Sequence, residues 1–318
     1  MKVWKKLLTG CLASIMLLSL CGCVDQHPEE ESIAGGTETV EEARIIATSN
    51  STLHICDKLG LDLITSHSTS GDIPAKYQGL PEIGTAMSPD AEQIALLEPT
   101  DVIGPDTLAE SIEPTYQAAG VPYTWIDLQS VEGMYDSIAM LGEKYGVQEA
   151  ADKLIAEYKA TMADFEKAIE GKTPPKVLVL MGLPGAYIEC TPNSYVGSLV
   201  ELAGATSVVQ VDDNMNFVSW NTEELLALDP DVILLTAHGL PDLAMEMFAE
   251  EFTTNDIWKH FRAVQEGKVY QLDYSTFGMS CTFDWPEALN ILREILYDGT
   301  YGAYDGEAAY AELNAGAA

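Results

Sequence analysis

Positive charge is scarce in this chain, which has 16 Lys and Arg residues against 50 Asp and Glu and a formal net charge of −34. So acidic a surface argues against nucleic acid as a partner and against binding anionic lipid through charge. Cysteine is also scarce: beyond Cys23 there are only Cys56, Cys190 and Cys281, without metal-like spacing. Three cysteines cannot all pair within the chain, so we expect buried thiols.

Enzyme signatures are missing as well. The chain has no Gly-x-Ser-x-Gly elbow, no Walker loop, no His-Glu-x-x-His and no Gly-x-Gly-x-x-Gly. We therefore predict a binding protein and not an enzyme.

Long apolar runs are lacking except for Leu7–Leu20, which three lysines precede. A charged start, a short apolar run and small residues at its end predict an export signal, and the run is short for a membrane span. The block Leu20-Cys21-Gly22-Cys23 resembles a bacterial lipobox, which predicts lipidation of Cys23. Removal of residues 1–22 leaves 13 Lys and Arg against 50 Asp and Glu, a formal charge of −37.

Two stretches of the chain repeat each other. Glu92–Pro99, which continues into Asp101–Ile103, recurs as Glu223–Pro230, which continues into Asp231–Ile233. Each copy is typical of a short helix that leads into a buried strand. The repetition predicts two similar α/β lobes, and two lobes form a cleft.

A long amphipathic helix is predicted between these lobes, from Val147 to about Gly171, by apolar residues at a period near 3.6. Such a helix would span roughly 37 Å, enough to bridge two lobes. The predicted fold is therefore α/β, with two similar lobes that have mostly parallel sheets, one backbone helix that joins them, and a ligand cleft between them. The predicted segments are a signal peptide (1–22), a flexible tether (23–42), an N-terminal lobe (43–146), the linking helix (147–172), a C-terminal lobe (173–298) and a tail (299–318). The predicted strands are Arg44–Ala47, Leu63–Ile64, Val102–Ile103, Tyr123–Trp125, Lys176–Met181 and Val232–Thr236.

The residues that flank the two repeats differ, and two of them, Met87 and His238, could bind a metal. Met87 stands just ahead of the first repeat's helix, where Ser88 is the predicted N-cap and Pro89 the first helical residue. His238 stands two residues past the second repeat's strand, at the edge where open α/β sheets bind ligands. A thioether and an imidazole from opposite lobes suggest a bound haem iron. Taken singly, Met87 fits core packing and His238 fits a loop or cap, while zinc or manganese sites need more His and carboxylate ligands than this context offers.

Six separated segments extend this interpretation into a family resemblance. They are Gly84–Asp90, Met181–Gly185, Asn193–Gly197, Ala237–Pro241, Thr254–Phe261 and Phe277–Met279. With them, residues 43–297 resemble the substrate-binding proteins of the helical-backbone class that serve ABC importers, and most closely the haem-binding lipoproteins of the iron-regulated surface determinant type.

The resemblance implies a function for the whole chain. It implies a lipid-anchored monomer on the outer face of the cell membrane of a Gram-positive bacterium. Such a protein receives haem from an upstream donor and delivers it to an ABC permease, with Met87 and His238 as the axial iron ligands. A cobalamin or ferric-siderophore carrier of the same class is the alternative. Met181 and Met279 are the next candidates for iron, although we expect them to line the pocket or fill the core. His54, His67 and His260 have weaker claims.

The cargo's propionates need donors in a very acidic protein. Backbone N–H groups at a helix start, at Thr48-Ser49-Asn50, would serve, although an ordinary strand-to-helix turn explains the same residues. Relatives place a Lys before the Pro equivalent to Pro74, and this chain does not. Four further residues are predicted to face the porphyrin or line its pocket, or equally to be core: Tyr187, Trp220, Phe277 and Met279.

The glutamates of the repeats predict a second surface. In the family that the chain resembles, one Glu on each lobe pairs with arginines of the permease, and the matching residues are Glu92 and Glu223. Two carboxylates on opposite lobes would also speed the encounter with a basic partner. Acids near helix starts have an ordinary explanation too, and a capping box with Asn221 accounts for Glu224.

Overall fold

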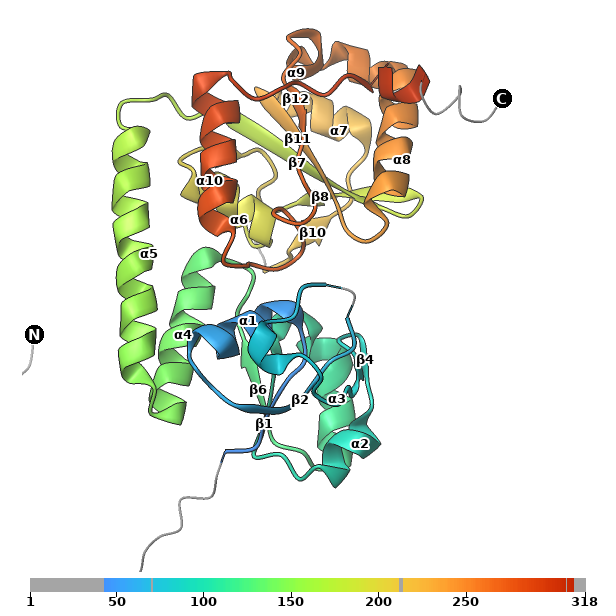
Figure 1. Cartoon of the computed structure of the whole chain (residues 1–318). Helices are drawn as coiled ribbons and strands as arrows, with labels where there is room; N and C mark the ends of the chain where they lie inside the picture. Colours follow the sequence, from blue (N-terminus) through green and yellow to red (C-terminus); the bar gives the residue numbers. More distant parts are fainter. Residues whose placement is uncertain (1–42, 70, 212–213, 307, 312–318) are drawn as a thin grey trace, which may run out of the picture. The chain divides into compact units, whose positions relative to one another are not determined.

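A computed structural model describes residues 43–69, 71–211, 214–306 and 308–311 (Figure 1). The N-terminal lobe contains a wholly parallel sheet, and the C-terminal lobe contains a sheet of parallel and antiparallel pairs. The first sheet has the order β2 (Leu63–Ser66), β1 (Ile45–Ala47), β5 (Asp101–Pro105) and β6 (Tyr123–Ile126). The second has the order β10 (Phe217–Val218), β8 (Ala186–Cys190), β7 (Lys176–Leu183), β11 (Val232–Ala237) and β12 (Val269–Gln271), with β9 (Thr206–Ser207) paired to β7. All six predicted strands are confirmed.

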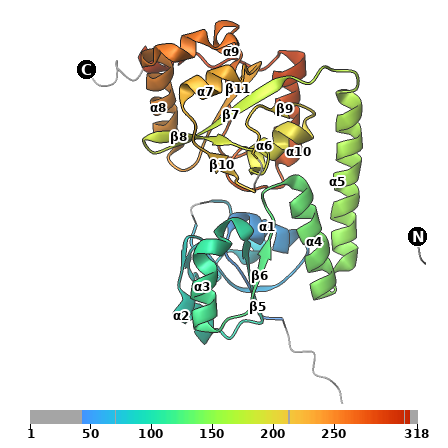
Figure 2. The same cartoon turned by 180° about the vertical axis from the view of Figure 1, so that it is seen from behind.

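Helices cover both faces of the N-terminal sheet (Figures 1 and 2). Successive side chains of a strand point to opposite faces, so Ile45 packs in the core that also contains helices α1 and α4, and Ile46 packs with α2 and α3. The near-continuous apolar strands are therefore buried on both sides. These four helices are α1 (Asn50–Lys58), α2 (Ala91–Leu96), α3 (Ala109–Ala119) and α4 (Val131–Tyr145).

The C-terminal sheet is covered in the same way. Val177 and Val179 of β7 belong to a core cluster with helices α6 and α10, whereas Leu178 and Leu180 pack with α7 and α8. The remaining elements are α6 (Tyr195–Leu202), α7 (Thr222–Ala227), α8 (Pro241–Thr254), α9 (Arg262–Gln265), α10 (Trp285–Arg293) and the short turns η1 (Ala75–Tyr77), η2 (Asp106–Leu108), η3 (Asp256–His260) and η4 (Glu294–Asp298). Beyond them, the Tyr304 amide donates to the Val269 carbonyl at 2.7 Å, so this part of the predicted tail is attached to the lobe.

The predicted linking helix is α5 (Gln148–Ala168), about 31 Å long at the usual rise per residue. It begins against α4, where Gly142 allows close packing: a Cβ there would lie 2.5 Å from the Cβ of Ala151. Just past its end, Ile169 approaches Gly204 of the C-terminal lobe. Two α/β lobes joined by one backbone helix are thus confirmed, with α5 shorter than predicted because Val147 and Ile169 are its caps.

The two repeats fold alike. The first forms α2 and β5, and the second forms α7 and β11. Each helix is followed by a left-handed residue directly before a proline, Glu98 with φ +46° and Asp229 with φ +47°. An arginine then binds the turn after each helix. Arg44 donates to the backbone carbonyl of Glu98 at 3.1 Å, and Arg262 donates to the side-chain carboxylate of Asp229 at 3.1 Å. The repeated sequence therefore encodes a repeated helix, turn and strand.

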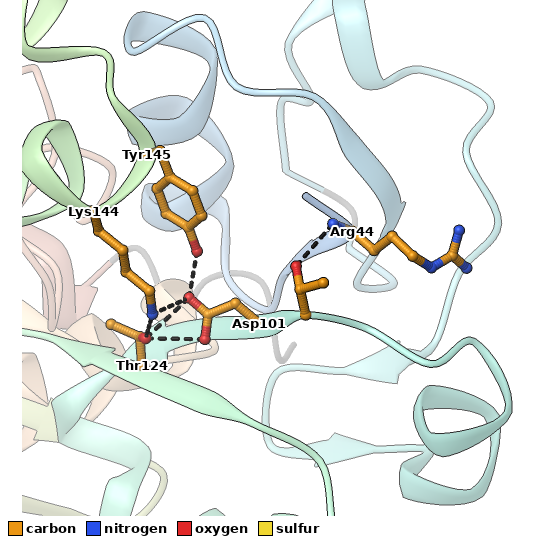
Figure 3. Close-up of polar contacts among 6 residues, drawn as sticks. Arg44, Asp101, Thr124, Lys144 and Tyr145 are labelled. Atoms are coloured by element: carbon orange, nitrogen blue, oxygen red, sulfur yellow. Dashed lines mark hydrogen bonds and ion pairs between the residues drawn. The ribbon is translucent and has the colours of Figure 1, made fainter. Parts of the chain in front are cut away.

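A buried carboxylate ties α4 to the N-terminal sheet at the end opposite the predicted ligand edge (Figure 3). Asp101, at the start of β5, is almost fully buried. It accepts hydrogen bonds from Thr124 at 2.9 Å, from Lys144 at 2.7 Å and from the Tyr145 hydroxyl. Burial, and then this contact with Asp101, hold the pKa of Tyr145 well above its usual range.

Replacement of this carboxylate should destabilise the lobe. We expect Asp101→Asn to lower the free energy of unfolding by about 2 kcal/mol, because it removes the negative partner of Lys144 while the site stays buried. Thermal unfolding followed by circular dichroism would measure this. The matched control is Asp62→Asn, since the Asp62–Lys76 ion pair at 3.0 Å is exposed and should contribute almost nothing. Equal melting temperatures for both variants would contradict the prediction.

Candidate functional site

Met87 lies at the tip of a β-hairpin made by β3 (Gly84–Thr85) and β4 (Ser88–Pro89). The prediction that Ser88 caps the following helix is wrong. Asp90 is the N-cap and accepts the Gln93 amide at 3.0 Å, because Ser88 and Pro89 are held in the hairpin. Gly84 has φ +88°, and a Cβ there would lie 2.6 Å from the Ser88 carbonyl, so only glycine lets the hairpin close. The Met87 side chain is 68% exposed.

This hairpin stands beyond the carboxyl end of β2. The Ile83 amide donates to the Ser66 carbonyl at 3.0 Å, and the Ser68 amide donates to the Gly84 carbonyl at 2.6 Å. These two hydrogen bonds join the base of the hairpin to the segment that continues β2, and so fix the hairpin to the sheet. Met87 is therefore an exposed thioether on an anchored loop at the edge where open α/β sheets bind their ligands.

His238 follows β11 directly, because the strand runs one residue further than predicted, to Ala237. Its backbone amide donates to the Gly182 carbonyl at 2.9 Å, and its side chain is exposed. Nearby protein atoms exclude water from part of the imidazole, and this partial desolvation lowers the pKa of His238. The lowered pKa favours the neutral imidazole that binds metals. Gly239 and Leu240 then both take left-handed conformations, with φ +64° and +44°. A leucine in that region is strained, and such strain gathers at functional sites.

The start of α1 has the predicted strand-to-helix turn. Ser49 is the N-cap and accepts the Thr52 amide at 3.2 Å. The Thr48 hydroxyl donates to the Ile103 carbonyl at 3.2 Å, and Asn50 is the first helical residue. The cap uses the Thr52 amide, whereas the amides of Asn50 and Ser51 have no carbonyl partner within the helix and remain available to an anion.

Three buried polar atoms without a hydrogen-bond partner among the described residues follow three neighbouring strands of the N-terminal sheet. They are Asn50 Oδ1 after β1, His67 Nδ1 after β2 and Asp106 Oδ1 after β5. Burial lowers the pKa of His67 and raises that of Asp106. His67 was predicted as a weak candidate for iron ligation, and no role was predicted for Asp106. Their places directly after strands were the available signal, but burial was not visible in the sequence.

The four residues predicted to face the cargo lie in different surroundings. Tyr187 is half-buried, with its ring 5.9 Å from that of Phe248 and its hydroxyl 3.3 Å from that of Thr222. Trp220 is partly buried in the same cluster as Tyr187, and Met279 is partly buried against the core cluster that includes residues of both lobes. Phe277 is 0% exposed and packs entirely within that core.

Glu189 is a buried carboxylate that sequence reasoning missed. It lies on β8, it is 0% exposed, and its Oε2 accepts the Trp220 amide at 2.9 Å. Its Oε1 is buried without a hydrogen-bond partner among the described residues. Burial, opposed by the Trp220 amide and supported by Glu224, raises the pKa of Glu189 to about 6.

This raised pKa predicts how stability depends on pH. Between about pH 4.5 and 6, the folded protein holds a proton that the unfolded chain has released, so stability falls as pH rises through this window. Glu189→Gln removes the free-energy cost of ionising this buried carboxyl group. We expect the variant to be more stable than the wild type at pH 7.5, on the order of 1 kcal/mol, and to lose this advantage at pH 4.5. Urea unfolding at both pH values, with Glu166→Gln on α5 as the exposed control, tests this. A difference independent of pH would contradict it.

Glu92 and Glu223 occupy equivalent places in the first turns of α2 and α7. Both side chains are exposed, and among the described residues neither forms a hydrogen bond or ion pair. The predicted capping box is confirmed, because Asn221 and Glu224 exchange hydrogen bonds at 2.9 and 3.1 Å. Capping therefore accounts for Glu224, whereas Glu92 and Glu223 have only the ordinary favourable placement of an acid near a helix start.

A pocket of about 650 Å³ lies between the segment 127–132 of the N-terminal lobe and seven residues of the C-terminal lobe: Pro192, Asn193, Ser198, Glu201, Leu202, Asn214 and Asn216. Its charged lining residues are Asp127, Glu132 and Glu201. None of the predicted cargo-binding residues lines it. The pocket and the predicted ligand residues are thus distinct features.

The predicted signal peptide, the tether and the lipidated Cys23 lie outside the described residues. Within the described residues no helix has the length and apolar character needed to cross a membrane. Cys56, Cys190 and Cys281 are buried and unpaired, as predicted. No group of three or more His, Cys, Asp or Glu side chains in that part of the chain could hold a metal ion.

Comparison with known proteins places the fold in a class. Residues 45–276 match the periplasmic binding protein family, and the chain belongs to this family. The chain is 35% identical over 293 residues to the high-affinity heme uptake system protein IsdE of Staphylococcus aureus, with 92% of this chain and 97% of the relative covered.

Two solved structures are also similar. An ABC transporter substrate-binding protein of Listeria monocytogenes is 38% identical with a TM-score of 0.77, and S. aureus IsdE complexed with heme is 36% identical with a TM-score of 0.76. Each match covers 81% of this chain and 100% of the other. The predicted family resemblance is thereby confirmed. So is the prediction of a binding protein and not an enzyme, because these relatives are uptake and substrate-binding proteins.

Proposed function

We propose that this chain binds haem outside the cytoplasmic membrane and delivers it to an ABC permease, with Met87 and His238 as the axial ligands of the iron. The observation that carries this proposal is the placement of these two side chains. Both are exposed on anchored loops at the carboxyl ends of strands, one in each lobe. The likeness to a protein solved with heme supports the cargo's identity.

The chemistry of this pair suits a carrier. Neutral imidazole is a strong donor to haem iron, and a thioether is a soft, weakly basic one. Together they occupy both axial positions, which leaves no open site for dioxygen. Iron is therefore held without being activated.

The remaining contacts follow from the cargo's two carboxylates and its flat apolar ring. The amides at the start of α1, around Thr48, Ser49 and Asn50, would receive a propionate in a lobe that has little positive charge. Partly buried Trp220, Tyr187 and Met279 would supply apolar surface. Phe277 lies entirely in the core, so it would support the residues that line the pocket and would not contact the porphyrin.

Delivery depends on attachment and docking. Lipidation at Cys23 would hold the monomer at the outer face of a Gram-positive cell membrane, where an upstream donor supplies haem. Glu92 and Glu223 would pair with arginines of the permease, one from each lobe. Two exposed acids in equivalent first turns support this role.

A hemin titration followed by absorbance tests the cargo. We expect a sharp Soret band that saturates at one hemin per chain, and no competition from a corrinoid or a ferric siderophore. Binding of cobalamin or a ferric siderophore without a Soret change would instead support the alternative carrier of the same class.

A further inference from the structure

An uncharged groove borders Glu92 on the N-terminal lobe. It has a volume of about 510 Å³ and lies between α2 and α3. Apart from Glu92, its walls consist of small residues without charge: Ala91, Ala95, Pro114, Thr115, Ala118 and Ala119. A single carboxylate thus stands on an otherwise apolar, closely approachable surface.

Leu96 extends this surface. It lies four residues after Glu92, on the same side of α2, and it is 84% exposed. Exposure of a large aliphatic side chain beside an unpaired acid is not required by the fold, because buried Ile94 and partly buried Ala95 already pack α2 against the core. The combination of acid, groove and leucine has the character of an interface.

The other lobe lacks this apolar component at the equivalent place. The two repeats align residue by residue, so Leu96 corresponds to Ala227 and Glu92 to Glu223. The neighbour of α7 is the turn η3, which carries Lys259 and His260, in place of a helix that presents alanines. The two acids are therefore equivalent in position but not in surroundings.

We propose that the groove between α2 and α3 is the seat of a basic, apolar segment of the permease, in which an arginine pairs with Glu92 and an adjacent aliphatic side chain rests against Leu96. This rests on the proposed docking function and deepens it. Charge complementarity identifies the occupant, because a surface as acidic as this one selects a cationic partner. Arginine fits best: its guanidinium pairs with a carboxylate in a bidentate manner, and its aliphatic stem can cover alanines.

The two lobes would then dock by different physics. The contact at Glu223 would be chiefly electrostatic, and the contact at Glu92 would also bury apolar surface. The N-terminal lobe would therefore supply the apolar part of the contact with the permease. Filling its groove should lower the rate of haem delivery even when both acids are intact.

Haem uptake by cells in which variants replace the native chain tests this. We expect Ala118→Trp, which fills the groove from an exposed position, to lower the initial rate of uptake at least tenfold, and Leu96→Ala to lower it about threefold. Haem titration of each purified variant should match that of the wild type. The control is Ala156→Trp, which adds the same bulk to an exposed alanine on α5.

The outcomes separate the two proposals. If Ala118→Trp and Leu96→Ala keep wild-type uptake while charge reversal at both acids abolishes it, docking stands and the groove's role is overturned. If charge reversal leaves uptake intact, docking itself fails. If light scattering shows that the wild-type chain is a dimer that Ala118→Trp dissociates, the groove binds a second copy and the proposal is overturned. Circular dichroism establishes that each variant folds.

Discussion

His238→Ala should weaken haem binding on the order of 100-fold, about 2.7 kcal/mol, and should shift the Soret band. Imidazole is the stronger of the two donors, and the anchored backbone of His238 presents it in one place. Met87→Ala should cost less, on the order of tenfold, because a thioether is a weak ligand and its exposed loop tolerates truncation. Hemin titrations with full absorbance spectra provide both numbers.

A matched histidine controls for general effects of the substitution. His260 is also exposed, but it lies on the turn η3 beside Trp258 and Phe261. His260→Ala should leave affinity and spectrum unchanged. Identical spectra for the wild type, His238→Ala and Met87→Ala would show that neither residue binds the iron, and would refute the ligand assignment.

The repeats made the fold predictable from the sequence. The same order of residues in Glu92–Pro99 and Glu223–Pro230 predicted two helices that lead into two buried strands, and both are present. Local physics explains this success. Each copy has its acid, its apolar periodicity and its proline within a dozen residues, so no distant contact is needed to specify the unit.

The surroundings of Met87 could not be predicted in the same way. Ser88 and Asp90 are both good N-caps, and Pro89 suits the first helical position as well as a short strand. The choice was made by hydrogen bonds to a distant segment, from the Ile83 amide to the Ser66 carbonyl and from the Ser68 amide to the Gly84 carbonyl, which hold residues 84–89 in a hairpin. Sequence reasoning identified the residue and misjudged the element that carries it.

Buried polar groups were likewise beyond reach. Glu189 looked like one more acid among 50, and nothing in its immediate sequence indicates 0% exposure. Its burial follows from the position of β8 between β7 and β10, which depends on pairing across the whole lobe. Asp106 was missed and His67 was given only a weak role for the same reason, because strand order decides what lies beside them.

Charge reversal of both docking acids should abolish delivery without affecting the cargo site. We expect cells that carry Glu92→Lys with Glu223→Lys to take up no haem, because two attractions to basic permease residues become two repulsions. Each single reversal should leave partial uptake. Haem titration of the purified double variant should be unchanged, since both side chains are exposed and, among the described residues, neither forms a hydrogen bond or ion pair.

Net charge needs separate control in so acidic a chain. Reversal of Glu149 and Glu166, two exposed acids on α5, changes the formal charge by the same amount at a different place. That variant should transport haem normally. Long-range attraction by total charge is screened at physiological salt, whereas direct ion pairs at two fixed points act at short range and are screened less. Loss of uptake in both double variants would point to overall charge as the cause. Loss of haem binding in the Glu92 and Glu223 variant would count against docking and would place these acids in the structure of the cargo site.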